Sequence, residues 1–122
     1  DALMQYYRLL RYVCNNPAAL TRTTDPIGAE LTKRHTSLVV PTHSAKLEAF
    51  IDLVESIRAA GDKTLVFTQW VAMSLELIAD ALAKAGIRYV THHGGQTKTK
   101  NQAAQEQFKS DPSITVFLSS DA

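Results

Sequence analysis

The chain has 122 residues and a formal net charge of +1, and 45% of its residues are hydrophobic and 20% charged. This composition is typical of one globular domain, and no apolar run approaches the ~20 residues that span a membrane. The lone cysteine, Cys14, excludes an internal disulfide and a zinc site of paired cysteines. We therefore expect a reducing cytosol as the default compartment.

The first predicted element is an amphipathic helix over most of residues 1–14, which Pro17 follows as a stop signal. Its apolar side chains recur at helical spacing: Leu3, Tyr6, Tyr7, Leu10, Val13 and Cys14. We expect Cys14 to be a small buried hydrophobe. Residues 21–42 show no sustained period, so we expect a connector there, with a short helical turn near 28–34.

From Ser44 onward, predicted helices and strands alternate. Ser44 is the expected N-cap of the next helix, and Gly61 and Gly86 are expected helix stops. The predicted elements are helices over 45–60, 71–85 and 99–109 and strands over 64–68, 87–92 and 114–119. The strands are near-continuous apolar runs, which is typical of a parallel sheet covered by helices on both faces.

Polar side chains follow each predicted strand. The three segments are Thr68-Gln69-Trp70, Thr91 to Thr97, and Ser119-Ser120-Asp121. Ligands bind beyond the carboxyl ends of an open parallel sheet, and hydroxyls, amides and helix-start N–H groups suit phosphate oxygens. Lys98 and Lys100 would add positive charge. Such hydroxyls also cap helices in many proteins, so the pattern leaves a phosphate site and simple capping both open.

Other candidate sites carry weaker signals. Residues 84–109 hold five Lys or Arg residues against one acid, which fits either an anion-binding surface or a solvated face. His92 and His93 are adjacent, but neighbouring strand residues face opposite ways, so we expect no metal site. Trp70 could stack on a base or pack over the sheet edge. The chain has no nucleophile–base pair, no paired carboxylates and no phosphate-binding loop, so we assign no catalytic residue.

Several segments occur in a telling order. They are LRYVCNNPAAL (10–20), SAKL (44–47), GDKTLVFTQW (61–70), IRY (87–89), GQT (95–97), Phe108 and VFLSSDA (116–122). From residue 44 on they resemble the second motor lobe of the Swi/Snf type of helicase-like ATPases, and the first resembles the helix that leads into that lobe. The resemblance implies an α/β fold: a partial RecA-like three-layer lobe with a parallel sheet of three strands, plus an N-terminal helix.

The resemblance divides the chain into a lead-in helix (1–20), a connector or insertion (21–43) and the first half of the lobe (44–122). It implies that DNA-backbone contacts come from ten residues: Thr68, Gln69, Trp70, Gly95, Gln96, Thr97, Lys98, Lys100, Ser119 and Ser120. The apolar part of KTLVFTQW would be a buried central strand, and its polar tail would face phosphate. Where the family usually has an arginine, this chain has Asn101, and Lys100 beside it keeps charge without the bidentate fork.

In the family, ATP and magnesium bind between two RecA-like lobes and duplex DNA crosses both. The partners implied for a full-length parent are therefore duplex DNA and the first lobe, with no membrane. The family pattern continues beyond residue 122, so we expect a fragment that alone binds no cofactor, hydrolyses no ATP and binds DNA weakly at best. Its last strand would lack later neighbours, and self-association through an exposed sheet edge is expected.

Two alternatives stay open at this point. One is the second lobe of an RNA helicase of the DEAD-box kind, which shares the fold. The other is a non-motor α/β module that binds a small ligand.

Overall fold

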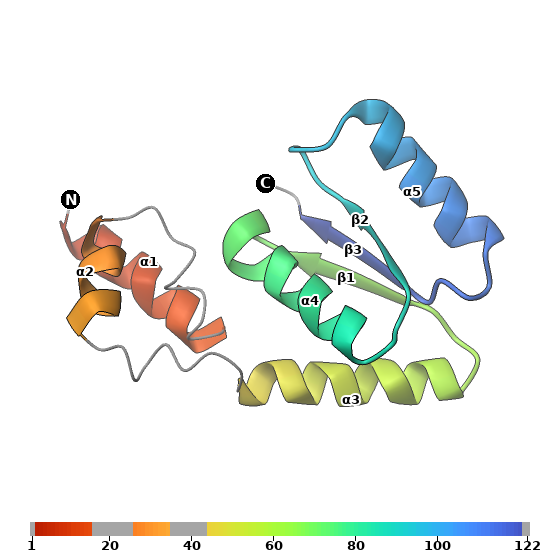
Figure 1. Ribbon diagram of the computed structural model, residues 1–122, viewed down its shortest axis with the longest axis horizontal. Helices are drawn as coiled ribbons and strands as arrows, with labels where there is room; N and C mark the ends of the chain where they lie inside the picture. The colour runs from red at the N-terminus through yellow and green to blue at the C-terminus, as the bar shows by residue number, and fades with distance from the viewer. Residues whose placement is uncertain (1, 16–25, 35–43, 121–122) are drawn as a thin grey trace.

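A computed structural model of the chain describes residues 2–15, 26–34 and 44–120 (Figure 1). Its elements are α1 (Ala2–Asn15), α2 (Pro26–Arg34), α3 (Ala45–Ala59), β1 (Thr64–Thr68), the π-helix η3 (Val71–Leu75), α4 (Glu76–Lys84), β2 (Tyr89–His92), α5 (Lys98–Ser110) and β3 (Val116–Ser120). Every element predicted after Ser44 is present, with bounds shifted by at most two residues. The second of these predicted helices opens as η3 before it continues as α4.

The predicted helix boundaries are confirmed by their hydrogen bonds and dihedral angles. The hydroxyl of Ser44 accepts a bond of 3.3 Å from the Leu47 N–H at the start of α3. Gly61 and Gly86 follow α3 and α4 with φ of +87° and +71°, a left-handed conformation that costs a glycine little. Local sequence therefore sets where these helices begin and end.

The sheet is parallel, with strand order β1-β3-β2. The expectation that the last strand lies at an open edge is wrong, because β3 pairs on both sides. The expectation that KTLVFTQW forms the central strand is also wrong, because β1 is an edge strand. The connection through α4 skips one position in the sheet, and β3 later fills it between β1 and β2.

Helices pack on both faces of the sheet, as predicted, with α3 and α4 on one face and α5 on the other. Residues alternate along β3, so Val116 and Leu118 face α3 and α4 while Phe117 faces α5. On the first face, Val116, Leu118 and Leu82 of α4 are fully buried, with no exposed surface. This face is the main core, and α5 covers a smaller second cluster around Val90 and Ala104.

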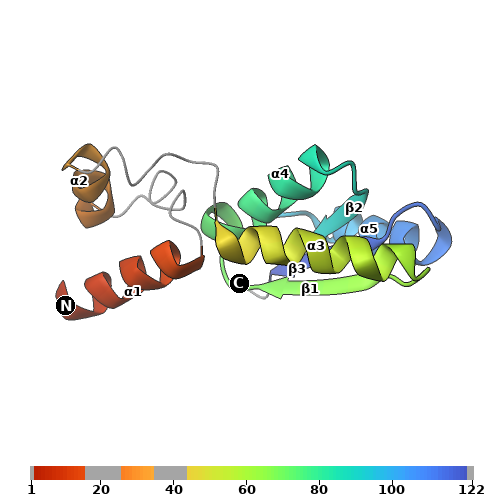
Figure 2. The same ribbon diagram turned by 90° about the horizontal axis from the view of Figure 1, so that it is seen from below.

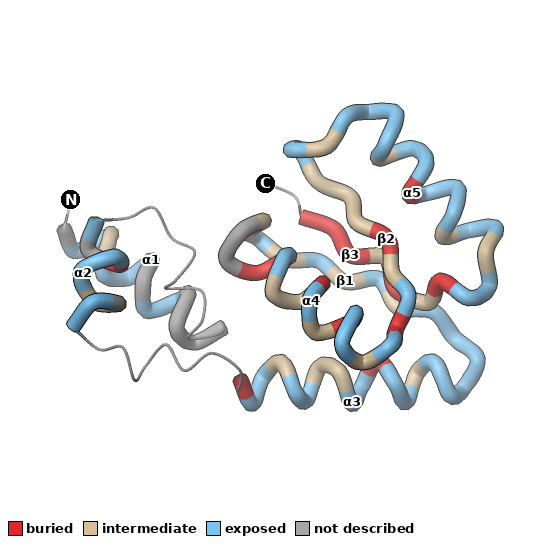
Figure 3. Tube along the Cα trace, in the orientation of Figure 1, coloured by how far each residue is buried: buried red, intermediate tan, exposed pale blue. Residues whose placement is uncertain are grey.

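One face of β1 is uncovered, which corrects the expectation of full cover on both sides. Leu65 and Phe67 are 60% and 70% exposed. They lie on the face that α5 covers over β2 and β3 only, so β1 runs through exposed and intermediate residues while β3 is mostly buried (Figure 3). The edge strand β1 therefore presents exposed apolar surface.

The N-terminal helices lie at one end of the molecule in both ribbon views (Figures 1 and 2). Along the predicted apolar stripe of α1, Leu3, Tyr6, Tyr7 and Leu10 are exposed. The predicted burial of Cys14 falls outside the side chains that the structure describes. The connector contains the nine-residue helix α2 where a short turn was expected. Among the described residues, no helix has both the length and the apolarity to cross a membrane.

Candidate nucleic-acid interface

The structure brings the polar ends of the three strands to one edge of the sheet. Thr68 pairs with Ser120, and Ser119 lies between Phe67 and His92 in the register. Neighbouring strands are about 4.8 Å apart, so the segment after β1 and the loop after β2 flank the end of β3. The arrowheads of β1 and β3 in Figure 1 point toward α1, which therefore lies beyond this edge.

The end of β1 is tied to its surroundings by hydroxyl groups. The Thr68 hydroxyl donates to the hydroxyl of buried Ser74 at 2.5 Å, and the Ser120 hydroxyl donates to the Gln69 carbonyl at 3.3 Å. The chain then enters η3, where the Leu75 N–H donates to the Trp70 carbonyl at 2.9 Å. Thr68 and Ser120 therefore join β1 to η3 and β3.

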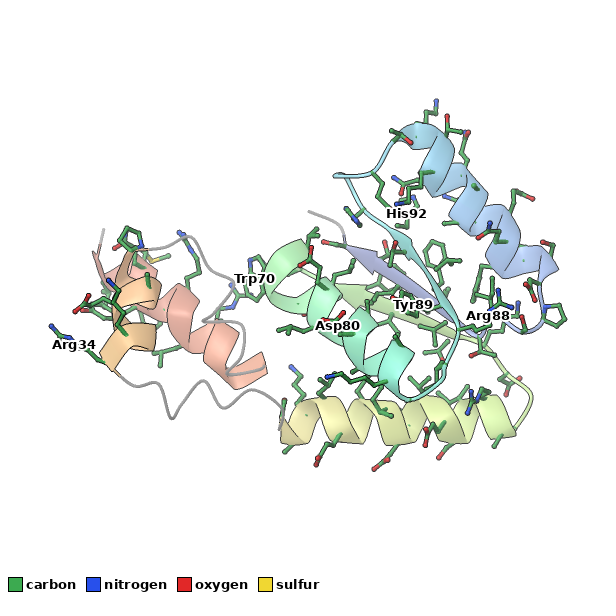
Figure 4. The ribbon with its side chains drawn as sticks, viewed as in Figure 1. Arg34, Trp70, Asp80, Arg88, Tyr89 and His92 are labelled. Carbon is green, nitrogen blue, oxygen red and sulfur yellow. The ribbon has the colours of Figure 1, made fainter. Side chains whose placement is uncertain are left out.

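Arg11 of α1 reaches the segment after β1. Its Nη2 donates to Oε1 of Gln69 at 2.6 Å, and its guanidinium lies 4.9 Å from the centre of the Trp70 ring. Figure 4 shows Trp70 between α1 and the start of η3. Sequence reasoning missed Arg11, because no spacing or periodicity links positions 11 and 69.

A cleft of about 340 Å³ adjoins this contact. Among the described residues, its lining includes two basic ones, Arg11 and Lys46, and no acidic one. Thr68, Gln69 and Trp70 also line it, together with apolar residues that include Phe50. Such a cleft is suited to an anion that carries an apolar part.

The loop after β2 is held by two amide side chains, Gln96 and Asn101. Nε2 of Gln96 donates to the Thr91 carbonyl at 2.9 Å and to Oδ1 of Asn101 at 3.1 Å. Nδ2 of Asn101 donates to the His93 carbonyl at 3.0 Å, and Oδ1 accepts from the His93 N–H at 3.3 Å. Gln96 thus has acceptors for its amide donors inside the chain. Sequence reasoning treated Asn101 only as a missing arginine.

Gly95 and Thr97 shape the loop just before α5 begins. The Gly95 N–H donates to Nδ1 of His93 at 3.1 Å, and a Cβ on Gly95 would lie 3.1 Å from that nitrogen. Thr97 caps α5, since its hydroxyl accepts from the Lys100 N–H at 3.2 Å. Simple capping is thus observed for Thr97, and the glycine allows the close approach of the His93 ring.

The basic side chains of this region are exposed. Lys98 and Lys100 are in the first turn of α5. A second, open hollow of about 440 Å³ is lined by His92, Gln96, Lys98, Asn101, Gln102 and Gln105. The His92 ring centre is 5.7 Å from that of Phe117, on the face of β2 toward α5 (Figure 4). By contrast, Ser119 and Ser120 are only 8% and 5% exposed.

At the opposite end of the sheet, a second polar cluster anchors the end of α5. Lys63 Nζ donates to the carbonyls of Phe108 and, at 3.0 Å, of Asp111. Arg88 pairs with the Asp111 carboxylate at 3.4 Å. Hydrogen bonds from the Ser113 hydroxyl and N–H, then the nearby cations, hold the pKa of Asp111 below its ordinary value. This cluster is remote from the carboxyl ends of the strands, and it stabilises the connection between α5 and β3.

The described part of the chain contains no cluster of three or more His, Cys, Asp or Glu side chains that could hold a metal ion.

Comparison with known proteins gives consistent relatives. Residues 45–122 match the family described as the helicase conserved C-terminal domain. The chain is 30% identical over 77 residues to DNA repair protein RAD5A of Arabidopsis thaliana, covering 63% of this chain and 7% of that protein. It is 38% identical over 77 residues to ATP-dependent helicase rhp16 of Schizosaccharomyces pombe, covering 62% and 9%.

Among solved structures, the fold resembles the Sulfolobus solfataricus SWI2/SNF2 ATPase C-terminal domain, with a TM-score of 0.72 and 21% identity over 97% of this chain and 46% of that one. The chain thus spans less than a tenth of these two curated relatives and about half of that solved domain. These matches favour the Swi/Snf interpretation over an RNA helicase or a non-motor module. The chain belongs to the helicase conserved C-terminal domain family, and the resemblance to its Swi/Snf type is confirmed by these relatives.

Proposed function

We propose that this chain is part of the second lobe of an ATP-dependent, DNA-stimulated translocase of the Swi/Snf type, and that its strand ends hold the phosphate backbone of one DNA strand. The observation that carries the proposal is the gathering of three polar segments at one edge of a parallel sheet. That edge is where open α/β sheets bind ligands.

The size of this edge suits a short stretch of backbone. β1 and β2 are separated by β3, which makes the span between them about 10 Å. One strand of a duplex advances about 3.4 Å along the axis per nucleotide, and because it also winds around the axis its successive phosphates are about 7 Å apart. The edge would therefore contact about two consecutive phosphates.

Each segment would contribute differently to such a contact. Lys98 and Lys100 are exposed, and the start of α5 adds N–H groups with a partial positive charge. Gln69 would offer its amide hydrogens to phosphate oxygens. Gln96 and Thr97, whose polar groups have partners in the chain, would shape the loop, as would Gly95. Ser119 and Ser120 are buried, so they would support the contact by holding the end of β3 in place at this edge. Contacts of this kind grip backbone and carry no direct base readout, which suits movement along any sequence.

The ATPase machinery is assigned to the rest of the protein. The chain has no phosphate-binding loop in its sequence, so we derive no step of hydrolysis from its residues. In the parent, ATP with magnesium would bind at the junction with the first lobe, and its hydrolysis would supply the free energy for movement along DNA. The 122-residue chain alone is expected to hydrolyse no ATP. The parent would be nuclear in a eukaryote and cytoplasmic in a bacterium.

The test is steady-state ATP hydrolysis by the longest natural protein that contains this sequence. Hydrolysis is measured at low salt without nucleic acid, with duplex DNA and with single-stranded RNA, because backbone binding weakens steeply as salt rises. Stimulation by duplex DNA supports the proposal. Stimulation by RNA alone would replace it with the RNA-helicase interpretation, and hydrolysis by the isolated chain would contradict the assignment of the ATPase machinery elsewhere.

A further inference from the structure

Arg11 is a cation without an anionic partner among the residues that the structure describes. Its two contacts are the amide oxygen of Gln69 and the ring of Trp70, both of which are neutral. Neither contact cancels its charge, and the described residues that line the cleft beside it include no acid. The positive potential there is therefore available to an anion from outside.

The same contact orients Gln69. An arginine can only donate hydrogen bonds, so the Gln69 oxygen must face it and the NH₂ group must face away. Gln69 is exposed, and among the described residues its NH₂ group has no acceptor. Arg11 thus presents two donors of Gln69 beside its own remaining guanidinium hydrogens.

The cleft adds a second cation and a place for an apolar group. Lys46, in the first turn of α3, also lines the cleft, so its two basic residues come from two different helices. The lining also includes apolar side chains of α3 and β1, among them Phe50 and Val66. Apolar lining lowers the local dielectric, which strengthens the attraction between a cation and a bound anion.

We propose that Arg11, with Lys46 and Gln69, forms a phosphate subsite at the carboxyl end of β1, which accepts a phosphate group that carries a sugar. Arg11 supplies the charge and positions Gln69. The inference rests on the proposed function for its preferred source of phosphate, the backbone of DNA. A free mononucleotide offers the same chemistry, and the experiment separates the two sources.

The test uses the full 122-residue chain at low salt, with Trp70 as the probe because it is the only tryptophan. Its emission is followed during titration with a short duplex DNA, with AMP and with inorganic phosphate, and duplex binding is measured independently by anisotropy of a labelled duplex. Arg11→Ala should weaken duplex binding about tenfold and lower the slope of log affinity against log salt by about one.

Two variants sharpen the result. Arg8→Ala removes the same charge from an exposed position of the same helix that does not line the cleft, and it should change binding less than about twofold. Arg11→Lys keeps the charge and loses the fork that orients Gln69, so it should keep the salt slope while losing part of the affinity.

The outcomes distinguish the two ideas. Duplex binding that Arg11→Ala and Arg8→Ala weaken equally overturns the subsite and leaves the proposed function intact. Arg11-dependent binding of AMP without binding of duplex supports the subsite with a free nucleotide as its source, and counts against the proposed function. No Arg11-dependent change of Trp70 emission with any of the three ligands overturns the subsite.

Discussion

Replacing Asn101 should remove the hydrogen bonds that hold the loop after β2 and so destabilise the folded chain. Its side chain makes three hydrogen bonds, with the N–H and the carbonyl of His93 and with Nε2 of Gln96, at 3.3, 3.0 and 3.1 Å. A typical bond contributes about 1 kcal/mol net, and partly buried His93 can recover some bonding from water, so Asn101→Ala should cost about 2 kcal/mol. For a folded unit the size of residues 44–120, this loss lowers the melting temperature by roughly 8–16 °C.

The assay is urea and thermal unfolding of the purified chain, followed by circular dichroism. Gln102→Ala is the matched control, because Gln102 is the next residue of α5 and is exposed. Asn101→Asp is the isosteric variant. It keeps the acceptor for the His93 N–H but sets a carboxylate against the His93 carbonyl, so it should also destabilise the chain.

The reasoning predicts a difference between neighbouring positions. If Asn101→Ala lies within about 0.5 kcal/mol of Gln102→Ala, the amide network does not hold the loop and the role given to Asn101 is wrong.

Three further changes test the fold and its surface. Leu82→Ala should cost about 2–5 kcal/mol of unfolding free energy because Leu82 is fully buried. Leu53→Ala, at a side chain that is 60% exposed, should cost under about 0.5 kcal/mol. Equal effects of the two changes in urea unfolding would refute the described core. The pKa of Asp111 is lower in the folded chain than its ordinary value, so its carboxylate stabilises the fold fully at pH values above that ordinary pKa. This stabilisation is lost as the pH falls through the lowered pKa of the folded chain. Asp111→Asn should therefore flatten the loss of stability between about pH 5 and pH 3, and an unchanged acid limb in unfolding curves would contradict this. Phe67→Glu should reduce self-association through the uncovered face of β1 without lowering stability, as measured by light scattering; unchanged scattering from an associating wild-type chain would place the contact elsewhere.

Much of the fold follows from local pattern. The helix that begins after Ser44 and the stops at Gly61 and Gly86 are decided by hydrogen bonds and dihedral preferences within a few residues, so the sequence alone located them. Apolar runs of strand length alternating with helical periods were enough to predict a parallel sheet. The order of short motifs was enough to identify the family.

The candidate site was predicted only in outline. That three polar segments meet at one edge follows from parallel strands, whose carboxyl ends lie together. That Gln96 and Asn101 bond to each other and to the backbone, and that Ser120 is buried, depends on rotamers and packing that no spacing rule contains.

Tertiary structure alone decided which strand is central and what reaches the end of β1. Strand order reflects how the helical connections pack, so β3 could occupy the centre although it comes last in the chain. Arg11 meets Gln69 across 58 positions of sequence. Such contacts form because the folded chain closes long loops to bury apolar surface, and local preferences cannot specify which distant side chains then become neighbours.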